Sequence, residues 1–259
     1  MRGAWSMRQL LVVLVLCLWA GAAAALDLTG DEADLRLGRE VEVLRDPGGR
    51  LTLADVLQAD GFAPATDHPD LSFGYTDDVL WLKLPLRSRA PRVQSWRIEF
   101  EYATVDRIDL FEVGNGGVNR KRSGDRMRFA ERGYAHRNPV FALTLAPDES
   151  RVLYLRAESQ GTMTLSSALW SDTRFRAHSE AQYSANALYV GTALALALYN
   201  LLLFMVLRER SILLYVGFVL CFATAVTAMT GFGAQFLWPE AFEFGNRMLG
   251  VGFAASSLL

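Results

Sequence analysis

An exported β-sandwich followed by transmembrane α-helices is the fold class that this sequence predicts. Three observations predict it. A stretch at the amino terminus has the pattern of a secretory signal, apolar and polar residues alternate through the segments that follow, and two long uncharged runs lie near the carboxyl end. The hydrophobic content of 51% is high for a soluble chain. The hydrophobic residues are concentrated in the last third of the chain. The sequence therefore indicates one part that lies in water and another that lies in lipid.

Residues 1–25, MRGAWSMRQLLVVLVLCLWAGAAAA, contain arginines, then a short apolar core, then alanines. This order is typical of a secretory signal peptide, and we expect cleavage near Ala25. The alternative is a retained anchor. It is disfavoured because the core from Leu10 to Ala20 is short of the roughly 20 residues that span a bilayer. The next domain, predicted over residues 26–178, is therefore expected outside the cytoplasm.

The segment VLWLKLPLRS, residues 79–88, alternates with a period of two, as in a strand with one buried side. One face is expected to carry Leu80, Leu82, Leu84 and Leu86, and the other Val79, Trp81 and Lys83.

WRIEFEY repeats this pattern. It predicts buried Trp96, Ile98, Phe100 and Tyr102 beside exposed Arg97, Glu99 and Glu101. Further strands are expected at 107–113, 139–145, 151–159 and 162–170, and a short helix capped by Thr52 runs to Ala59. Many short strands with turn residues between them are typical of an antiparallel sandwich.

The exported domain offers no catalytic pattern. Its histidines, His68, His136 and His178, are far apart, and we expect each at the surface. Asp77 and Asp78 are adjacent, so in an extended chain they point to opposite faces and fit a solvated turn better than a carboxylate pair. We predict no enzyme, no metal site and no cofactor; an envelope enzyme acting on glycans is the least favoured class.

Binding is a more plausible activity for this domain. Trp81 and Lys83 share the outward face of one strand, and Tyr154, Arg156 and Glu158 share that of another. Aromatic rings beside hydrogen-bonding groups can form a platform for a sugar or another small polar ligand. The alternative is that loops cover these faces and the rings belong to the core.

The carboxyl-terminal region, residues 182–259, is predicted to cross the membrane. Uncharged runs from Gln182 to Leu207 and from Ser211 to Pro239 predict helices at about 183–207 and 212–230. Only Arg208, Glu209 and Arg210 separate them. This short loop forces a helical hairpin, and its arginines place it in the cytosol by the positive-inside rule.

Two residues in the first span indicate helix packing. Asn200 is expected to donate across a bundle, because an amide in hydrocarbon needs a partner. Gly191 favours close helix contact. A third helix is expected from about 247, and with only 12 residues from Met248 to Leu259 we expect the sequence to be the front part of a longer membrane protein.

With these segments assembled, the chain resembles bacterial seven-transmembrane receptors with diverse intracellular signalling modules that carry the second type of extracellular sensor domain. The resemblance rests on LSFGYTDDVLWLKLPLRS, on Gly124-Asp125 followed by Arg132, and on RNPVFALTLAPDESRVLYLRAES. In the membrane region it rests on Tyr189-Val190-Gly191, Tyr199-Asn200-Leu201 and RERSILLYVGF.

The resemblance implies a periplasmic jelly-roll domain similar to carbohydrate-binding modules, a seven-helix bundle in the bacterial inner membrane, and a cytoplasmic output module. Against that plan, this sequence is expected to hold an incomplete bundle and no output module.

The leading functional hypothesis is a sensor that binds a small molecule or carbohydrate and transmits the change through residues 170–183. The alternative is a membrane-anchored module that docks another envelope protein or glycan without signalling. The lipid bilayer is an expected partner, and a homodimer is left open. Basic residues form no stripe, so we expect no nucleic-acid partner.

Overall fold

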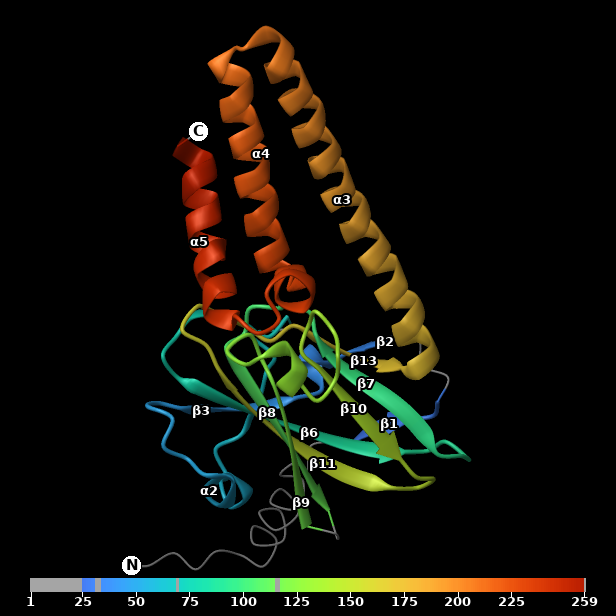
Figure 1. Cartoon of the computed structure of the whole chain (residues 1–259). Helices are drawn as coiled ribbons and strands as arrows, with labels where there is room; N and C mark the ends of the chain where they lie inside the picture. The colour runs from blue at the N-terminus through green and yellow to red at the C-terminus, as the bar shows by residue number, and fades with distance from the viewer. Residues whose placement is uncertain (1–24, 31–33, 69, 115–116, 259) are drawn as a thin grey trace, which may run out of the picture.

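A computed structural model describes residues 25–30, 34–68, 70–114 and 117–258. The predicted signal peptide lies outside these residues, apart from Ala25. A β-rich part and a group of helices stand one above the other, and the polypeptide passes from strand β13 directly into helix α3 (Figure 1).

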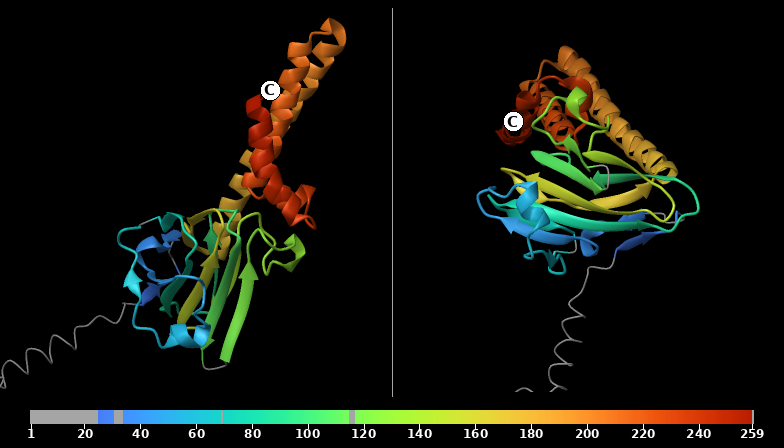
Figure 2. Two further views of the ribbon diagram at one scale, coloured as in Figure 1. Left: turned by 90° about the vertical axis from the view of Figure 1, so that its left-hand side faces the viewer. Right: turned by 90° about the horizontal axis from the view of Figure 1, so that it is seen from below.

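The β-rich part is a sandwich of two main sheets, which Figure 2 shows as stacked layers. The larger sheet has the order β4-β3-β6-β11-β8-β9, and β1 pairs in parallel with β6. Its strands are β1 (Leu26–Leu28), β3 (Glu42–Asp46), β4 (Ala63–Pro64), β6 (Val79–Ser88), β8 (Arg107–Gly114), β9 (Gly117–Ser123) and β11 (Ser150–Glu158).

The smaller sheet has the order β10-β7-β13-β2, and a separate pair joins β12 to β5. These strands are β2 (Asp34–Arg36), β5 (Ser72–Tyr75), β7 (Gln94–Phe100), β10 (Val140–Leu145), β12 (Thr162–Thr164) and β13 (Ser167–Ser171). The predicted single strand at 162–170 is therefore two strands, because β12 pairs with β5 and β13 pairs with β7 and β2. Short helices occur at η1 (Leu37–Arg39), α2 (Leu53–Leu57) and η2 (Phe129–Glu131).

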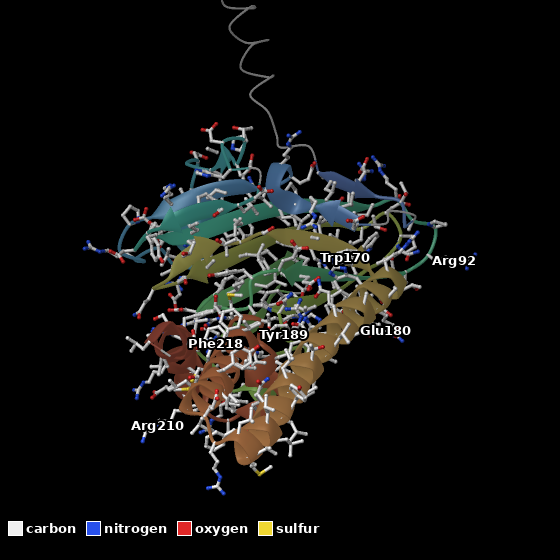
Figure 3. The ribbon with its side chains drawn as sticks, turned by 90° about the horizontal axis from the view of Figure 1, so that it is seen from above. Arg92, Trp170, Glu180, Tyr189, Arg210 and Phe218 are labelled. Atoms are coloured by element: carbon white, nitrogen blue, oxygen red, sulfur yellow. The ribbon has the colours of Figure 1, made fainter. Side chains whose placement is uncertain are left out.

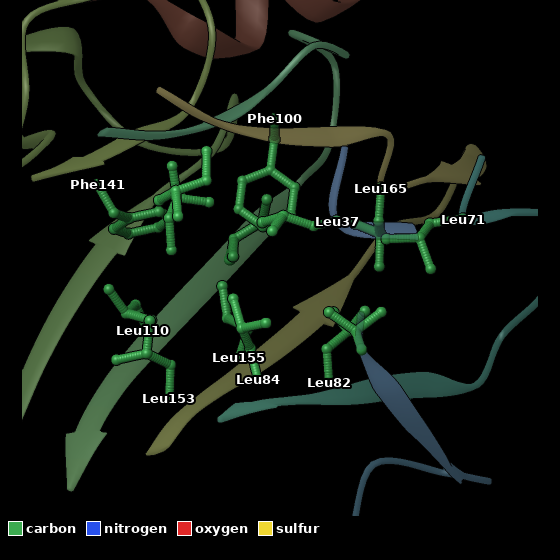
Figure 4. Packing of buried hydrophobic residues seen from close by; sticks show 14 of the residues in the cluster. Leu37, Leu71, Leu82, Leu84, Phe100, Leu110, Phe141, Leu153, Leu155 and Leu165 are labelled. Carbon is green, nitrogen blue, oxygen red and sulfur yellow. The ribbon is translucent and has the colours of Figure 1, made fainter. Parts of the chain in front are cut away.

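The main core lies between the two sheets, as the alternation predicts. Figure 4 shows leucines of the larger sheet facing Phe100, Phe141 and Leu165 from the opposite side. Each inward leucine of β6 is at most 1% exposed. Burying each such side chain contributes about 1.5–3 kcal/mol, so the alternating pattern fixes which face of each strand is inside.

The outward face of the larger sheet is also partly buried. Trp81 is 1% exposed and Tyr154 is 8% exposed, and they form a second cluster with Val56 of α2 and Phe111. Helix α2 is held in place by a capping box, in which Thr52 and Asp55 satisfy each other's backbone groups. Loops and α2 therefore cover this face, which was the alternative considered for Trp81.

The outward face of the smaller sheet is covered as well, and here the expectation for Glu99 was wrong. Its side chain is fully buried, although the alternation predicts exposure. The expectation for His136 was also wrong, since it is 3% exposed. Both errors have one cause: the first turns of α3, together with the loop before β10, pack onto this face.

The helical part contains α3 (Asp172–Leu207), α4 (Arg210–Met229) and α5 (Phe242–Leu258), with the single π-helical turn η3 (Gly233–Leu237) between the last two. Helices α3 and α4 are each long and apolar enough to cross a membrane. With 36 residues, α3 rises about 54 Å, well beyond a hydrocarbon core of roughly 30 Å. It begins ahead of the predicted start near residue 183, because its polar first turns lie against the sandwich.

The helices pack through small residues. Ala193 and Ala197 of α3 meet Val216 and Val219 of α4, and α4 and α5 approach so closely that a Cβ added at Gly252 would lie 2.9 Å from that of Ala225.

The two residues singled out for helix packing have no partner on another helix among the described residues. Asn200 donates to the Leu196 carbonyl oxygen of its own helix at 2.9 Å, and its hydrogen bond across a bundle stays a prediction. A Cβ added at Gly191 would meet nothing within 4 Å among the described residues.

The inter-sheet core predicts a large cost for truncation. Leu84→Ala should destabilise the sandwich by about 2–5 kcal/mol, because Leu84 is fully buried and its removal leaves a cavity. Denaturation of the full chain in detergent, followed by tryptophan fluorescence, measures the change. The control Val118→Ala, at a side chain that is 52% exposed, should cost less than about 0.5 kcal/mol. Equal costs at the two positions would contradict the assigned core.

Candidate functional site

Residues 124–139, between β9 and β10, form a segment that we call the docking loop; it includes η2. The docking loop lies between the sandwich and the helices (Figure 1). Seen from above in Figure 3, Trp170 and Glu180 lie toward the sandwich end of α3, and Arg210 lies at the far end of the helices. The docking loop therefore occupies the junction of the two parts.

Arg137 joins three segments at this junction. Its guanidinium donates to the carbonyl oxygen of Thr230 at 2.9 Å and to the side chain of Gln182. Its backbone N–H donates to the Tyr183 hydroxyl at 3.3 Å, and that hydroxyl donates to Gln235 at 2.6 Å. Arg137 is only 9% exposed, so these partners replace water for a buried cation.

The backbones at the junction also meet directly. Phe129 N–H donates to the Pro239 carbonyl oxygen at 3.0 Å. Gly231 has φ +76°, and a Cβ added there would lie 2.4 Å from the carbonyl oxygen of Arg137. Only glycine permits this approach, so the docking loop and the α4–α5 connection fit each other closely.

A buried polar cluster fixes the first turns of α3 to the smaller sheet. Glu99 accepts a hydrogen bond from the Asn138 amide at 2.7 Å, and its other oxygen lies 3.4 Å from His178 Nε2. The His178 ring stacks on Trp170, with centroids 4.1 Å apart. Burial raises the pKa of Glu99, while the Asn138 hydrogen bond and the His178 charge oppose that rise.

His136 packs beside this cluster, against Phe175 and Tyr183 of α3. Its Nδ1 accepts the Asn138 backbone N–H at 3.2 Å. Burial, followed by the positive charge of Arg137, lowers the pKa of His136 to about 4, so the ring is neutral at ordinary pH.

Asp125 connects the docking loop to α5, where Asn246 hydrogen-bonds to its carboxyl group. Burial, followed by the charge of Asp106, raises the pKa of Asp125 to about 6, although Arg132 and Arg126 oppose the rise. Gly124, just before it, has φ +149°, and a Cβ there would lie 2.3 Å from the Asp106 carbonyl oxygen. The glycine therefore lets the chain turn tightly into the docking loop.

A cleft of about 630 Å³ opens beside the docking loop, where strands of the larger sheet begin or end. Its walls come from the turn after β3, the starts of β6 and β8, the ends of β9 and β11, and the docking loop itself. The polar residues that line it are Asp77, Asp78, Asp106, Arg107, Arg122, Ser123, Arg126, Glu131, Arg156, Glu158, Ser159 and Gln160. Its volume falls within the range of small-molecule sites.

Beneath the cleft, a buried carboxylate holds several arginines in place. The side chain of Asp109 is fully buried and lies 2.9 Å from Arg107 and 3.0 Å from each of Arg120 and Arg122. Burial alone would raise the pKa of Asp109, but hydrogen bonds from Arg120 and Arg122 lower it below its ordinary value. Two arginines that line the cleft, Arg107 and Arg122, are therefore held by a buried carboxylate.

The five residues predicted for ligand contact lie in different places. Arg156 and Glu158 line the cleft and pair with each other at 2.5 Å. Trp81 and Tyr154 are in the second cluster, and Lys83 pairs with Glu42 at 3.0 Å, over the Phe62 ring. On the paired strands β6 and β11, Lys83 stands opposite Tyr154 and Trp81 opposite Arg156, so the predicted residues share one face of the larger sheet, but only Arg156 and Glu158 line the cleft.

The docking loop and most of the cleft were missed as a site by sequence reasoning. A signal was present, because NRKRSGDRMRFAER, residues 119–132, has the densest charge in the exported domain. Gly124, Asp125 and Arg132 were singled out only as carriers of the family resemblance. Asp77, predicted as a solvated turn residue, is exposed and lines the cleft.

Family models match both parts of the chain. The 7TMR-DISM extracellular 2 model matches residues 38–171, and the 7TM diverse intracellular signalling model matches residues 182–259. The chain belongs to the 7TMR-DISM family. Members of this family are membrane receptors, so the sandwich of this 7TMR-DISM chain is its extracellular sensor domain and α3 and α4 are membrane helices.

A search of curated proteins finds no match for this 7TMR-DISM chain. Solved structures with similarity include a Bacillus thuringiensis Cry1Da tryptic core variant, at 13% identity and a TM-score of 0.26 over 57% of this chain and 25% of the other. The Cry4Aa toxin from Bacillus thuringiensis matches at 15% identity and 0.24, over 53% and 23%.

A GH31 alpha-xylosidase from Xanthomonas citri matches at 10% identity and 0.24, over 58% and 17%. The chain thus spans a quarter or less of each of these three proteins, and similarity this low carries no functional argument.

The close backbone contact at Gly231 predicts a sensitive position. Gly231→Ala should separate the docking loop from the helices, because the added Cβ would overlap the Arg137 carbonyl oxygen. Trypsin should then cleave faster at the exposed Arg126 and Arg128 in the full chain in detergent. The control Gly250→Ala, where a Cβ meets nothing within 4 Å, should leave the cleavage rate unchanged. Unchanged cleavage in both variants would show that the loop does not dock there.

The raised pKa of Asp125 predicts a pH dependence. Between the ordinary value near 4 and about 6, the folded chain binds more protons at this group than the unfolded chain, so its contribution to stability falls as pH rises. Asp125→Asn should therefore gain stability over the native chain as pH rises from 4 to 7, mostly below pH 6 and on the order of 2 kcal/mol, with no further gain above pH 7.

Thermal unfolding of the full chain in detergent from pH 4 to 7.5 measures this difference profile. The exposed variant Asp60→Asn serves as the control and should give a flat difference. A flat profile for Asp125→Asn as well would contradict burial of this carboxyl group at the junction.

Proposed function

We propose that this chain is a receptor of the bacterial inner membrane that detects a small polar solute in the periplasm and transmits its binding into the membrane helices. The sandwich acts as the sensor, the cleft as the ligand site and the docking loop as the transmitting segment. Arg208 and Arg210 lie in the cytosol in this proposal, in keeping with the positive-inside rule. In this proposal the membrane helices pass the signal to a cytoplasmic output module.

One observation carries the proposal: the docking loop contacts both the cleft and the helices. Arg126 and Glu131 line the cleft, whereas the neighbouring Asp125 and Arg132, with Arg137, face α5 and the α4–α5 connection. A ligand that moves Arg126 or Glu131 must therefore move residues that touch the helices. Only a ligand that prefers one arrangement of the loop can shift the equilibrium between arrangements.

Helix α3 provides a second connection. It starts at the end of β13 without a linker and continues through the membrane span. Its first turns are held by the Glu99 cluster and by an ion pair between Arg97 and Asp172. A shift of the smaller sheet is thus carried along a single rigid element, within the predicted transmitting segment 170–183.

The cleft, rather than the outward aromatic face, supports ligand binding. Charged and amide side chains dominate its walls, while Trp81 and Tyr154 lie beneath α2 and its neighbouring loops. A carbohydrate, as implied by the family resemblance, would have to be recognised here by its hydroxyl groups alone, since the cleft-lining residues that the structure describes include no aromatic ring.

Coupling can be tested without knowing the ligand. Arg126→Gln removes the ion pair with Asp106, 3.0 Å long, at the wall of the cleft. We expect amide hydrogen exchange in residues 230–246 of the full chain in nanodiscs to rise by about threefold or more, because the loop contacts there are weakened.

The matched control is Arg92→Gln, at an exposed arginine between β6 and β7 that does not line the cleft. It should leave exchange in 230–246 unchanged. If Arg126→Gln also leaves it unchanged while altering exchange in the cleft, the sandwich and helices are independent and the receptor mechanism fails.

A further inference from the structure

One imidazole nitrogen at the junction has two neighbours that require opposite protonation states of it. His178 Nε2 lies 2.6 Å from the side-chain amide nitrogen of Gln182 and 3.4 Å from the carboxylate of Glu99. An amide nitrogen only donates hydrogen bonds, and a carboxylate only accepts them. Nε2 can therefore accept from Gln182 when it carries no proton, or donate to Glu99 when it carries one, but it cannot do both.

Arg137 determines which of these two contacts is made. Its guanidinium donates to the side-chain oxygen of Gln182, and this oxygen must face Arg137 because a guanidinium has no acceptor. The NH2 group of Gln182 therefore faces His178, and Nε2 accepts from it without carrying a proton. Through Gln182, the protonation of His178 is linked to the contact between the docking loop and α3.

Glu99 is incompletely satisfied in this arrangement. Its side chain is fully buried, and one of its oxygens accepts from Asn138 at 2.7 Å. The other oxygen, Oε2, is buried and accepts no hydrogen bond in the part of the chain that the structure describes. Burying a carboxylate oxygen without a donor is costly. Since Oε2 is the oxygen that lies 3.4 Å from His178 Nε2, a proton between these two atoms would satisfy it.

The surroundings of the pair favour the arrival of a proton. The His178 side chain is 24% exposed, so the pair is accessible from water. Its ring stacks on Trp170 with centroids 4.1 Å apart, and the face of a tryptophan attracts a cation. Burial raises the pKa of Glu99, so this carboxylate takes up a proton more readily than an exposed one. Whichever of the two residues holds the proton, the lone pair of Nε2 is no longer available to Gln182.

Neighbouring groups leave this pair as the acid-sensitive element of the cluster. Arg97 and Asp172 pair with each other at 2.5 Å. Burial, followed by the positive charge of Arg137, lowers the pKa of His136 to about 4, so that ring stays neutral above pH 5. Histidine is the side chain that ordinarily changes charge between pH 5 and 8. The titratable and charged groups around the pair are Arg97 and Glu101 from the smaller sheet and its following turn, Arg132, Tyr134, His136 and Arg137 from the docking loop, and Asp172, Arg174 and Tyr183 from α3.

We propose that Glu99 and His178 together form a proton-binding site, and that acid outside the cytoplasm is a second stimulus of this receptor. A proton from water binds between Nε2 and Oε2, and the pair changes from one negative charge to none. Gln182 then loses the acceptor of its NH2 group and turns away, so Arg137 loses the oxygen of Gln182. The docking loop is released from α3 at this point but keeps its hydrogen bond to Thr230 of α4. The stimulus, though not the proton site, rests on the proposed role of the docking loop as the transmitting segment.

Hydrogen exchange of the full chain in nanodiscs at pH 7.5 and pH 5 tests the proposal, with each amide corrected for the intrinsic effect of pH. Every chain carries Asp125→Asn, because Asp125, with its pKa raised by burial to about 6, also titrates in this range. We expect exchange in residues 133–139 to rise by about threefold or more at pH 5. His178→Gln should abolish the rise. The matched control His68→Gln, at a histidine between β4 and β5, should retain it.

A second variant keeps the test valid if His178→Gln loosens the fold. In Gln182→Glu, a carboxylate can accept from Arg137 and from a protonated His178 at the same time, so acid no longer releases the docking loop. Exchange in residues 133–139 should then stay constant or fall at pH 5. The proposal is overturned if the chain with native Glu99, His178 and Gln182 shows no rise, or if the rise persists in His178→Gln or in Gln182→Glu.

The proton site and the receptor function can fail separately. If acid raises exchange in residues 133–139 through His178 but leaves residues 230–246 unchanged, the proton site stands and transmission to the helices fails. If acid leaves the docking loop unchanged while Arg126→Gln still raises exchange in residues 230–246, the proton site is wrong and the receptor function stands.

Discussion

The burial of Arg137 is the constraint on which the junction between sandwich and membrane depends. A guanidinium removed from water must have its donors satisfied, and here the partners come from α3 and from the end of α4. Moving either helix away alone would remove one of these acceptors from the buried guanidinium, and a hydrogen bond to a charged group contributes about 1.5–3 kcal/mol. The glycine at 231 allows the same region to close tightly. The sandwich, which lies in water, and the helices, which lie in lipid, are thereby held together as one unit.

The ligand site has the opposite character, because its charges lie at a surface and are only partly paired. Among the arginines that line it, Arg107 and Arg122 pair with the buried Asp109, and exposed Asp77 stands on another wall. Since Glu131 and Arg137 belong to the same docking loop, a response in the cleft reaches the buried junction through six residues of backbone. Because this path is short, a ligand that displaces the docking loop at the cleft is sufficient to displace Arg137 at the junction.

Sequence patterns predicted the architecture because they depend on short-range periodicity. The leucines of β6 alternate and are all buried, and the uncharged runs coincide with α3 and α4. The burial of Glu99 and His136 could not be predicted, because it arises from α3, whose residues lie far along the chain. Alternation likewise assigned Trp81 to the outward face without revealing that α2 covers it. The cleft escaped detection since its walls come from strand ends distant in sequence.

The most direct test of the account is a distance measurement between the two parts. With Cys17 and Cys221 replaced by alanine, spin labels on cysteines introduced at Thr144 in β10 and at Arg210 in α4 can be measured by pulsed electron resonance in nanodiscs. A sandwich locked to the helices through Arg137 predicts one narrow distance distribution, which broadens in Arg137→Ala. A broad distribution in the chain with native Arg137 would show that the sandwich moves freely on the membrane, and would contradict the account.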